Sequence, residues 1–113
     1  MKRMILVTAG VLALFASGMS VASADDVPTF EITIKDHKFD PEKFDVPAGK
    51  DFKLIVKNLD ATPEEFESFD FPVEKIIAGG GEGVFNVEAL DAGDYKFFGE
   101  FNMDTANGVI TAK

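Results

Sequence analysis

The stretch FDPEKFDVPAGKDFKLIVKN, residues 39–58, decides the fold of this chain. In its first half, two prolines and a glycine surround a short apolar pair, Phe44 and Val46, which suits an edge strand between two turns. In its second half, apolar and polar side chains alternate from Phe52 to Val56, and a period of two is typical of a half-buried strand. The stretch therefore predicts two short strands joined by a turn.

Alternation of the same kind recurs on both sides of this stretch, in FEITIKD, GVFNVEAL and GDYKFFGEF, and GVITAK adds a last strand. The residues predicted to share an apolar face are Phe30, Ile32 and Ile34 in the first, Phe85 and Val87 in the second, and Tyr95, Phe97 and Phe101 in the third. Helix has little room, and we expect TPEEFESF to be a turn or irregular link into a strand at ESFDF. Short strands separated by Gly and Pro predict an all-β fold, a Greek-key β-sandwich.

The first 24 residues predict a secretory signal peptide. Lys2 and Arg3 precede the apolar run MILVTAGVLALFA, and the small residues of ASA, residues 22–24, fit the cleavage rule. The run is shorter than the ~20 residues that a membrane span needs. We therefore expect cleavage after Ala24, no membrane insertion of the mature chain, residues 25–113, and a periplasmic location.

The remaining length supports one compact domain, because 113 residues less the 24 of the signal leave 89. Eleven of these are phenylalanines, which can supply a dense core. There is no cysteine, so the chain has neither a disulfide nor a thiolate metal site. Loss of Lys2 and Arg3 takes the net charge from −9 to −11. That charge argues against nucleic acid as a partner and favours cations.

The motifs then point to a family. Residues 39–58 resemble the opening half of the cupredoxins, with an aromatic-x-Pro turn, a Val-Pro-Ala-Gly hairpin and a strand that ends in Asn. GDYKFFGEFNMDTANGVITAK, residues 93–113, resembles their closing half, where a strand of aromatic residues leads into the copper-binding loop and a final strand. The resemblance implies a cupredoxin-like domain over residues 25–113.

The ligands of a blue-copper site are missing from this pattern. Such a site needs two histidines and a cysteine thiolate, usually with a weak axial methionine. By position, Gly99 stands where the cysteine would be, Asn102 stands where the loop histidine would be, and Glu64 or Glu65 lies near the place of the first histidine. Blue-copper electron transfer is therefore excluded. With one histidine and Ser68 as the only serine after residue 24, no nucleophilic triad is indicated either, and we assign no enzymatic activity.

A narrower resemblance is carried by NLDATPEEFESFDF, EKIIAGGG and YKFFGEFNMDTANG. These segments resemble the cupredoxin-like proteins associated with bacterial periplasmic iron uptake, which accompany ferrous-iron permease systems. The resemblance implies carboxylate-rich loops on the same scaffold and the binding of iron or copper. It also implies a role in iron oxidation or delivery and a membrane iron permease system as partner.

Carboxylates from two segments are the candidate metal ligands. In the cupredoxin arrangement, the link after the third strand and the loop before the last strand meet at one end of the sandwich. Carboxylates gathered there repel one another, so a cation would relieve the strain. Oxygen ligands suit hard ions such as ferric iron. The residues expected to meet are Glu64, Glu65 and Glu67 on one side and Glu100, Met103 and Asp104 on the other.

We predict a metal site of Glu65, Glu67 and Glu100, to which Met103, Asp104 or His37 would add a ligand. Met103 is either a surface cap or a thioether contact to copper. His37 is either an exposed turn residue or an imidazole ligand.

Our main functional hypothesis is a periplasmic accessory of iron uptake that binds an iron or copper ion. One alternative is a metal-free interaction domain that docks on a periplasmic or permease partner. The other is a copper-binding or copper-delivery protein that uses His37 and Met103.

Overall fold

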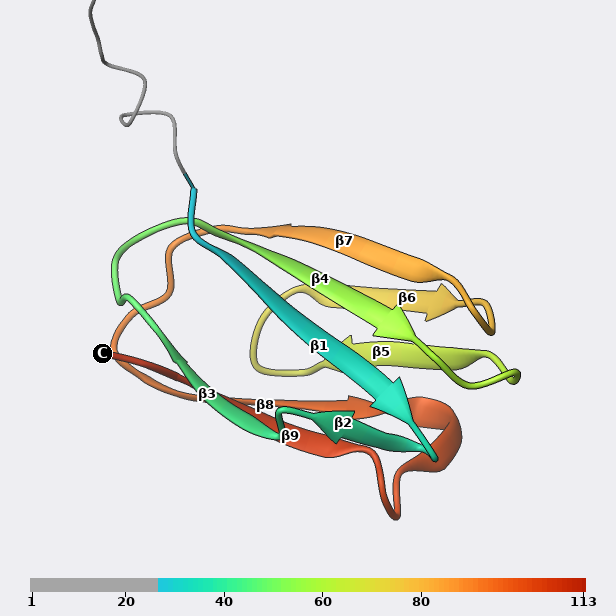
Figure 1. Ribbon diagram of the computed structural model, residues 1–113. Helices are drawn as coiled ribbons and strands as arrows, with labels where there is room; N and C mark the ends of the chain where they lie inside the picture. Colours follow the sequence, from blue (N-terminus) through green and yellow to red (C-terminus); the bar gives the residue numbers. More distant parts are fainter. Residues whose placement is uncertain (1–26) are drawn as a thin grey trace, which may run out of the picture.

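The computed structural model describes residues 27–113, which form a sandwich of two β-sheets (Figure 1). The predicted signal peptide, residues 1–24, lies outside the described residues. One sheet has the strand order β2-β1-β4-β7, and the other has the order β3-β9-β8-β5-β6. The elements are β1 (Thr29–Lys35), β2 (Lys38–Asp40), β3 (Lys43–Val46), β4 (Phe52–Asn58), β5 (Glu64–Ser68), β6 (Val73–Ile77), β7 (Glu82–Val87), β8 (Gly93–Gly99), the short 3-10 helix η2 (Glu100–Asn102) and β9 (Asn107–Ala112).

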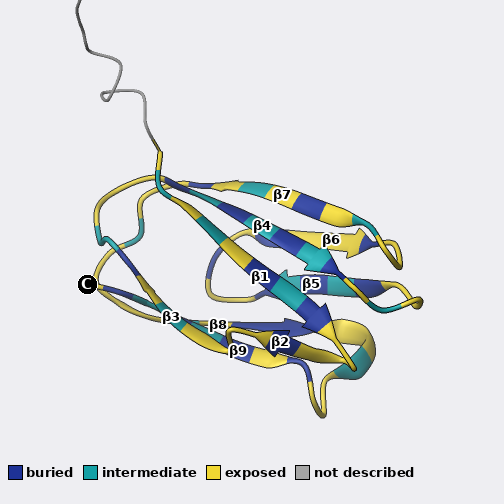
Figure 2. Cartoon of the chain, in the orientation of Figure 1, coloured by how far each residue is buried: buried dark blue, intermediate teal, exposed yellow. Residues whose placement is uncertain are grey.

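The predicted all-β sandwich is confirmed, and the alternation places the predicted side chains inside. Along β4 every second residue is buried, and β1 and β5 show the same banding (Figure 2). The centre of the core is aromatic, with the ring of Phe97 5.1 Å from that of Phe39 and 5.4 Å from that of Phe66, between ring centroids. Gly108 of β9 makes room for this centre, because a Cβ there would lie 2.1 Å from the ring of Phe97.

The edge strand predicted around Phe44 and Val46 is confirmed as β3, which pairs in parallel with β9 at one edge of the five-stranded sheet. Val46 is buried and Phe44 is half-buried. The turn between β3 and β4 passes through Gly49, whose φ of 74° lies in the left-handed region that glycine adopts without strain. None of the residues from 27 onward forms a helix long and apolar enough to cross a membrane.

The segment after β4 was predicted incorrectly in one respect. Residues 64–68 are already a strand, β5, whereas the residues of FDF after it form a turn into a further strand, β6. The alternation of β5 is hard to recognise in the sequence because two of its three inward positions are polar, Glu64 and Ser68. The hydroxyl of Ser68 donates a short hydrogen bond to the carbonyl oxygen of Lys96, at 2.5 Å, which satisfies it inside the sandwich.

Phe101 is not on the core face where the sequence pattern placed it. The strand β8 ends at Gly99, the chain turns into η2, and the side chain of Phe101 is half exposed. Phe98, which points away from the core, is nevertheless buried because Phe69 packs against it with ring centroids 5.0 Å apart. The strand β8 thus has an apolar side chain on each face, Phe97 toward the core and Phe98 away from it.

Candidate metal site

Glu64 lies inside the sandwich, where no acidic residue was predicted. It is the first residue of β5, and it is 2% exposed. One carboxylate oxygen, Oε1, accepts hydrogen bonds from the backbone N–H of Phe101 at 2.8 Å and of Glu65 at 3.1 Å. The other, Oε2, accepts a hydrogen bond from Nδ2 of Asn102 at 2.6 Å. The buried carboxyl group is therefore held by two donors from the loop before β9 and one from β5 itself.

Gly99 completes this arrangement. A Cβ at Gly99 would lie 2.6 Å from the carboxyl carbon of Glu64 and 2.9 Å from the Cβ of Ala106, so only glycine leaves room for the carboxylate. The three positions that the resemblance equates with copper ligands therefore do converge. Of the two adjacent glutamates on β5, it is Glu64 and not Glu65 that meets Asn102 and Gly99. These residues do not suit blue copper, because a glycine offers no ligand and the carboxylate and the amide are bonded to each other.

The predicted metal ligands of β5 lie on the opposite face of the same strand. Glu65 and Glu67 point away from the core, as alternation requires, and both are partly exposed. The register of the β5–β6 hairpin places Glu74 directly opposite Glu67. One oxygen from each of Glu65, Glu67 and Glu74 can be chosen so that all three atoms lie within 4.8 Å of one another. Among residues 27–113, this is the only group of three or more His, Asp or Glu with such spacing.

Glu74 was missed by the sequence analysis because β6 was not recognised as a strand. A hairpin centred on the FDFP turn would have paired VEKII with EEFES and placed Glu74 beside Glu67. The apolar positions at the two ends of β6, Val73 and Ile77, are spaced by an even number of residues, which was the available signal.

The carboxylates influence one another's protonation. Partial burial is the main reason that the pKa of Glu65 is raised above its ordinary value of 4.5, and the hydrogen bond with Glu74 and the charges of Glu74, Glu67 and Glu100 raise it further. The pKa of Glu67 is raised by partial burial, by the charges of Glu74 and Glu100, and by a hydrogen bond with Glu100. Glu100, the first residue of η2, therefore belongs to the surroundings of the cluster. We call Glu65, Glu67, Glu74 and Glu100 the carboxylate cluster.

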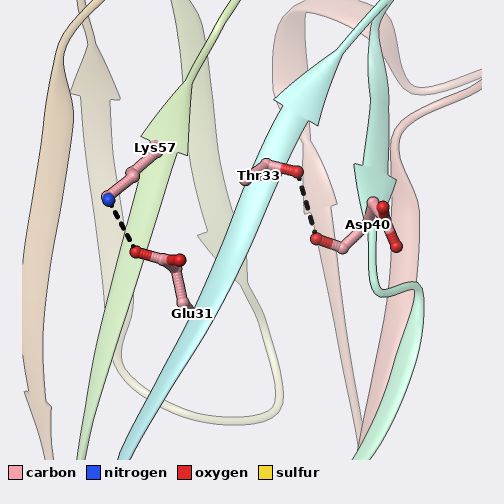
Figure 3. Close-up of polar contacts among 4 residues, drawn as sticks. All are labelled: Glu31, Thr33, Asp40 and Lys57. Carbon is pink, nitrogen blue, oxygen red and sulfur yellow. Dashed lines mark hydrogen bonds and ion pairs between the residues drawn. The ribbon is translucent and has the colours of Figure 1, made fainter.

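No lysine neutralises this cluster in the part of the chain that the structure describes. The ion pairs found there join Lys57 to Glu31, at 2.8 Å, and Lys113 to Asp45, at 3.2 Å. Figure 3 shows the first of these on β1 and β4, next to the hydrogen bond from Thr33 Oγ1 to the carbonyl oxygen of Asp40, at 3.2 Å. Glu31 and Asp45 thus each have a lysine partner, whereas the carboxylate cluster has mainly other carboxylates as neighbours.

The other predicted ligands, Asp104, Met103 and His37, are not members of the group of three. Asp104 is exposed in the turn after η2, and Met103 is half exposed and lines a cavity together with Phe69 and Phe98. His37 is exposed in the turn after β1, with Nε2 3.4 Å from Oγ1 of Thr62. Metal ligation by these three residues stays a prediction.

The turn that carries His37 is held by a carboxylate of its own. Asp36 and His37 both have positive φ, 53° and 61°, and their two N–H groups donate to the side chain of Asp60 at 2.8 and 3.0 Å. The hydrogen bond from His37 is the main reason that the pKa of Asp60 is lowered. Thr105 Oγ1 also donates to the carbonyl oxygen of His37, at 2.6 Å. The turn after β1, the loop after β4 and the loop before β9 therefore meet at one end of the sandwich (Figure 1).

Comparisons with known proteins agree with this architecture. The model of the cupredoxin-like domain family matches residues 5–112. A protein of Rickettsia prowazekii (strain Madrid E), RP394, is 43% identical over 86 residues, which are 76% of this chain and 69% of the relative.

The similar solved structures include auracyanin A and amicyanin. Auracyanin A, a blue copper protein from Chloroflexus aurantiacus, matches with a TM-score of 0.67 and 15% identity over 78% of this chain and 100% of that chain. Amicyanin from Paracoccus versutus matches with a TM-score of 0.58 and 16% identity over 82% of this chain and 90% of that chain. At these identities the likeness shows the fold alone.

Proposed function

Because this chain belongs to the family of cupredoxin-like domains, we propose that it is a metal-binding protein of that fold which holds its cation at the carboxylate cluster. The observation that carries the proposal is the convergence of ligand oxygens from Glu65, Glu67 and Glu74 within 4.8 Å, with Glu100 as a further acidic neighbour. The copper-ligand positions of the fold are filled by Glu64, Asn102 and Gly99, so the cluster is the better place for an ion.

The chemistry of the cluster favours iron. Carboxylate oxygens are hard ligands, and they stabilise ferric over ferrous iron. A site of this kind would promote the loss of an electron from bound ferrous iron, with a separate acceptor to take that electron. The protein's own contribution is to hold the carboxylates on two paired strands, so that little rearrangement is needed when the cation binds.

The wider setting of the proposal rests on the sequence. A signal peptide over residues 1–24 would export the chain to the periplasm, and the likeness to proteins that accompany ferrous-iron permease systems supports a role as an accessory of iron uptake. In that role the domain would bind iron on its way to a membrane permease.

Calorimetric titration of the metal-free protein with Fe(II), without oxygen, tests the proposal. We expect binding of one ion per chain and a melting temperature that rises with metal concentration. At a free metal concentration ~100 times the Kd, the native state should gain about 2.7 kcal/mol. The triple variant Glu65→Gln, Glu67→Gln, Glu74→Gln should lose both the heat of binding and the stabilisation.

A matched control variant removes the same number of charges elsewhere. Glu82, Glu88 and Asp91 are exposed and lie outside the carboxylate cluster. Replacing them by Gln, Gln and Asn should leave iron binding unchanged. Equal loss of binding in both triple variants would mean that the protein attracts cations only through its overall charge. Binding of Cu(II) or Cu(I) that depends on His37 and Met103 would favour the copper alternative instead.

A further inference from the structure

A large aromatic side chain is exposed next to the carboxylate cluster. Phe69, in the turn between β5 and β6, is 81% exposed, and its only aromatic neighbour among residues 27–113 is Phe98, at 5.0 Å between ring centroids. A single exposed apolar side chain is common, whereas several that lie together often mark an interaction site. Met103 is also half exposed, and its side chain lines the same cavity as these two rings.

The cavity is a groove over the outer face of the five-stranded sheet. It has a volume of about 680 Å³, and its apolar lining includes Phe69, Phe97, Phe98, Met103 and Val109. Its charged lining residues, Glu42, Lys43, Asp70 and Lys96, comprise two acids and two bases. A second hollow, of about 700 Å³, shares Phe69 and Asp70 with the groove and is also lined by Glu67 and Glu74. The groove therefore adjoins a hollow that contains two residues of the carboxylate cluster.

The charge of this surface limits the kind of protein that can bind to it. The net charge of the chain is −9, and the acidic hollow beside the groove has no lysine or arginine among its lining residues. A second copy of the chain would bring a further carboxylate cluster toward the first, and like charges at an interface repel. A partner with lysine or arginine around an apolar side chain would instead match both the groove and the hollow.

We propose that the groove and the acidic hollow together form a docking surface for a basic partner protein. An apolar side chain of the partner enters between Phe69, Phe98 and Met103, and its lysines or arginines pair with Glu67 and Glu74. The inference goes beyond cation binding, because docking of this kind needs no metal.

Nuclear magnetic resonance with a model peptide tests the inference. The probe is a lysine-rich heptapeptide with one central phenylalanine, added to the isotope-labelled protein in the presence of a chelator. We expect the amide signals around Phe69, Phe98 and Met103 to shift, and the affinity to fall when salt is raised to ~0.5 M. Phe69→Ser should weaken binding about tenfold or more, as the loss of a central aromatic contact does. A peptide with serine in place of its phenylalanine should bind as weakly to the wild-type protein.

Leu59→Ser provides the matched control, since Leu59 is 58% exposed and does not line the groove. This variant should bind the peptide like the wild type. Phe69→Ser should keep its iron binding, whereas loss of the three carboxylates should weaken both processes. Failure of docking is thus distinguishable from failure of the metal site. Shifts elsewhere on the surface, or equal binding by Phe69→Ser, would overturn the proposal. A dimer that Phe69→Ser dissociates would overturn it as well, because the occupant would be a second copy.

Discussion

At the scale of single residues, Glu64 ties the loop before β9 to the rest of the sandwich. Its carboxylate accepts hydrogen bonds from Phe101 and Asn102, and both donors come from that loop. The sequence analysis placed Glu64 near a copper-ligand position, but the residue type gave no indication that it would be buried. Acidic side chains are rarely buried without a partner, and the partner lies 38 residues away in the sequence.

Replacing Glu64 by Ala should destabilise the protein strongly. The change removes the acceptor of two loop donors and leaves a cavity, so we expect a loss of roughly 2–5 kcal/mol in the free energy of unfolding. Urea denaturation at neutral pH measures it. Glu82→Ala, at an exposed position, should change stability by no more than about 0.5 kcal/mol. Similar values for the two variants would show that the buried hydrogen bonds of Glu64 contribute little.

Gly99→Ala tests the packing around the same carboxylate. The added Cβ would lie 2.6 Å from the carboxyl carbon of Glu64, and overpacking of this kind costs roughly 1–3 kcal/mol. In the background of Glu64→Ala the cost should shrink, because the contacted atoms are gone. A double-mutant cycle, measured by urea denaturation, compares the cost of Gly99→Ala in the wild type with its cost in the Glu64→Ala variant. Additive effects would mean that the substitution acts through Ala106 or the backbone and not through Glu64.

At the scale of elements, β5 carries two kinds of acidic residue on its two faces. Glu64 points inward and is bonded, whereas Glu65 and Glu67 point outward toward Glu74 and Glu100. The sequence correctly predicted that Glu65 and Glu67 share a face, since that follows from the period of two. It missed Glu74, because the three consecutive exposed residues of β6 hide the alternation of a strand. β5 itself was not recognised as a strand in the sequence, because two of its inward residues, Glu64 and Ser68, are polar.

The pH dependence of stability should reveal the repulsion on β5. The pKa values of Glu65 and Glu67 are raised in the folded state, so the native protein binds more protons than the unfolded chain between the ordinary value of 4.5 and the raised values. Stability therefore falls as pH rises through that window, and the penalty is fully present at neutral pH.

The double variant Glu65→Gln, Glu67→Gln should melt at a higher temperature than the wild type at pH 7, because it lacks the repulsion. The difference should shrink as the pH falls below the ordinary value. Glu82→Gln with Glu88→Gln removes the same charge from exposed positions and serves as the control. Thermal melts across this pH range give the comparison. A difference that grows on acidification would contradict the raised pKa values.

At the scale of the whole molecule, the sandwich follows from regularities that are visible in the sequence. Apolar alternation in β1, β4 and β8 marks the inner faces, and the Pro and Gly residues around β3 mark an edge. The meeting of the link after β4 with the loop before β9 was inferred from the cupredoxin resemblance, and the hydrogen bonds of Glu64 with Phe101 and Asn102 agree with it. Which acidic side chains enter the interior and which gather outside depends on three-dimensional packing, so those assignments required the structure.

The most direct test of the metal site is paramagnetic broadening of amide signals by Mn(II), a hard divalent ion that suits oxygen ligands. If the cation binds at the carboxylate cluster, substoichiometric Mn(II) should broaden the signals of Glu65, Glu67, Glu74 and Glu100 first, and the triple Gln variant should lose this effect. Broadening centred on His37 and Met103, or spread evenly over the acidic surface, would contradict a metal site on the outer face of β5 and β6.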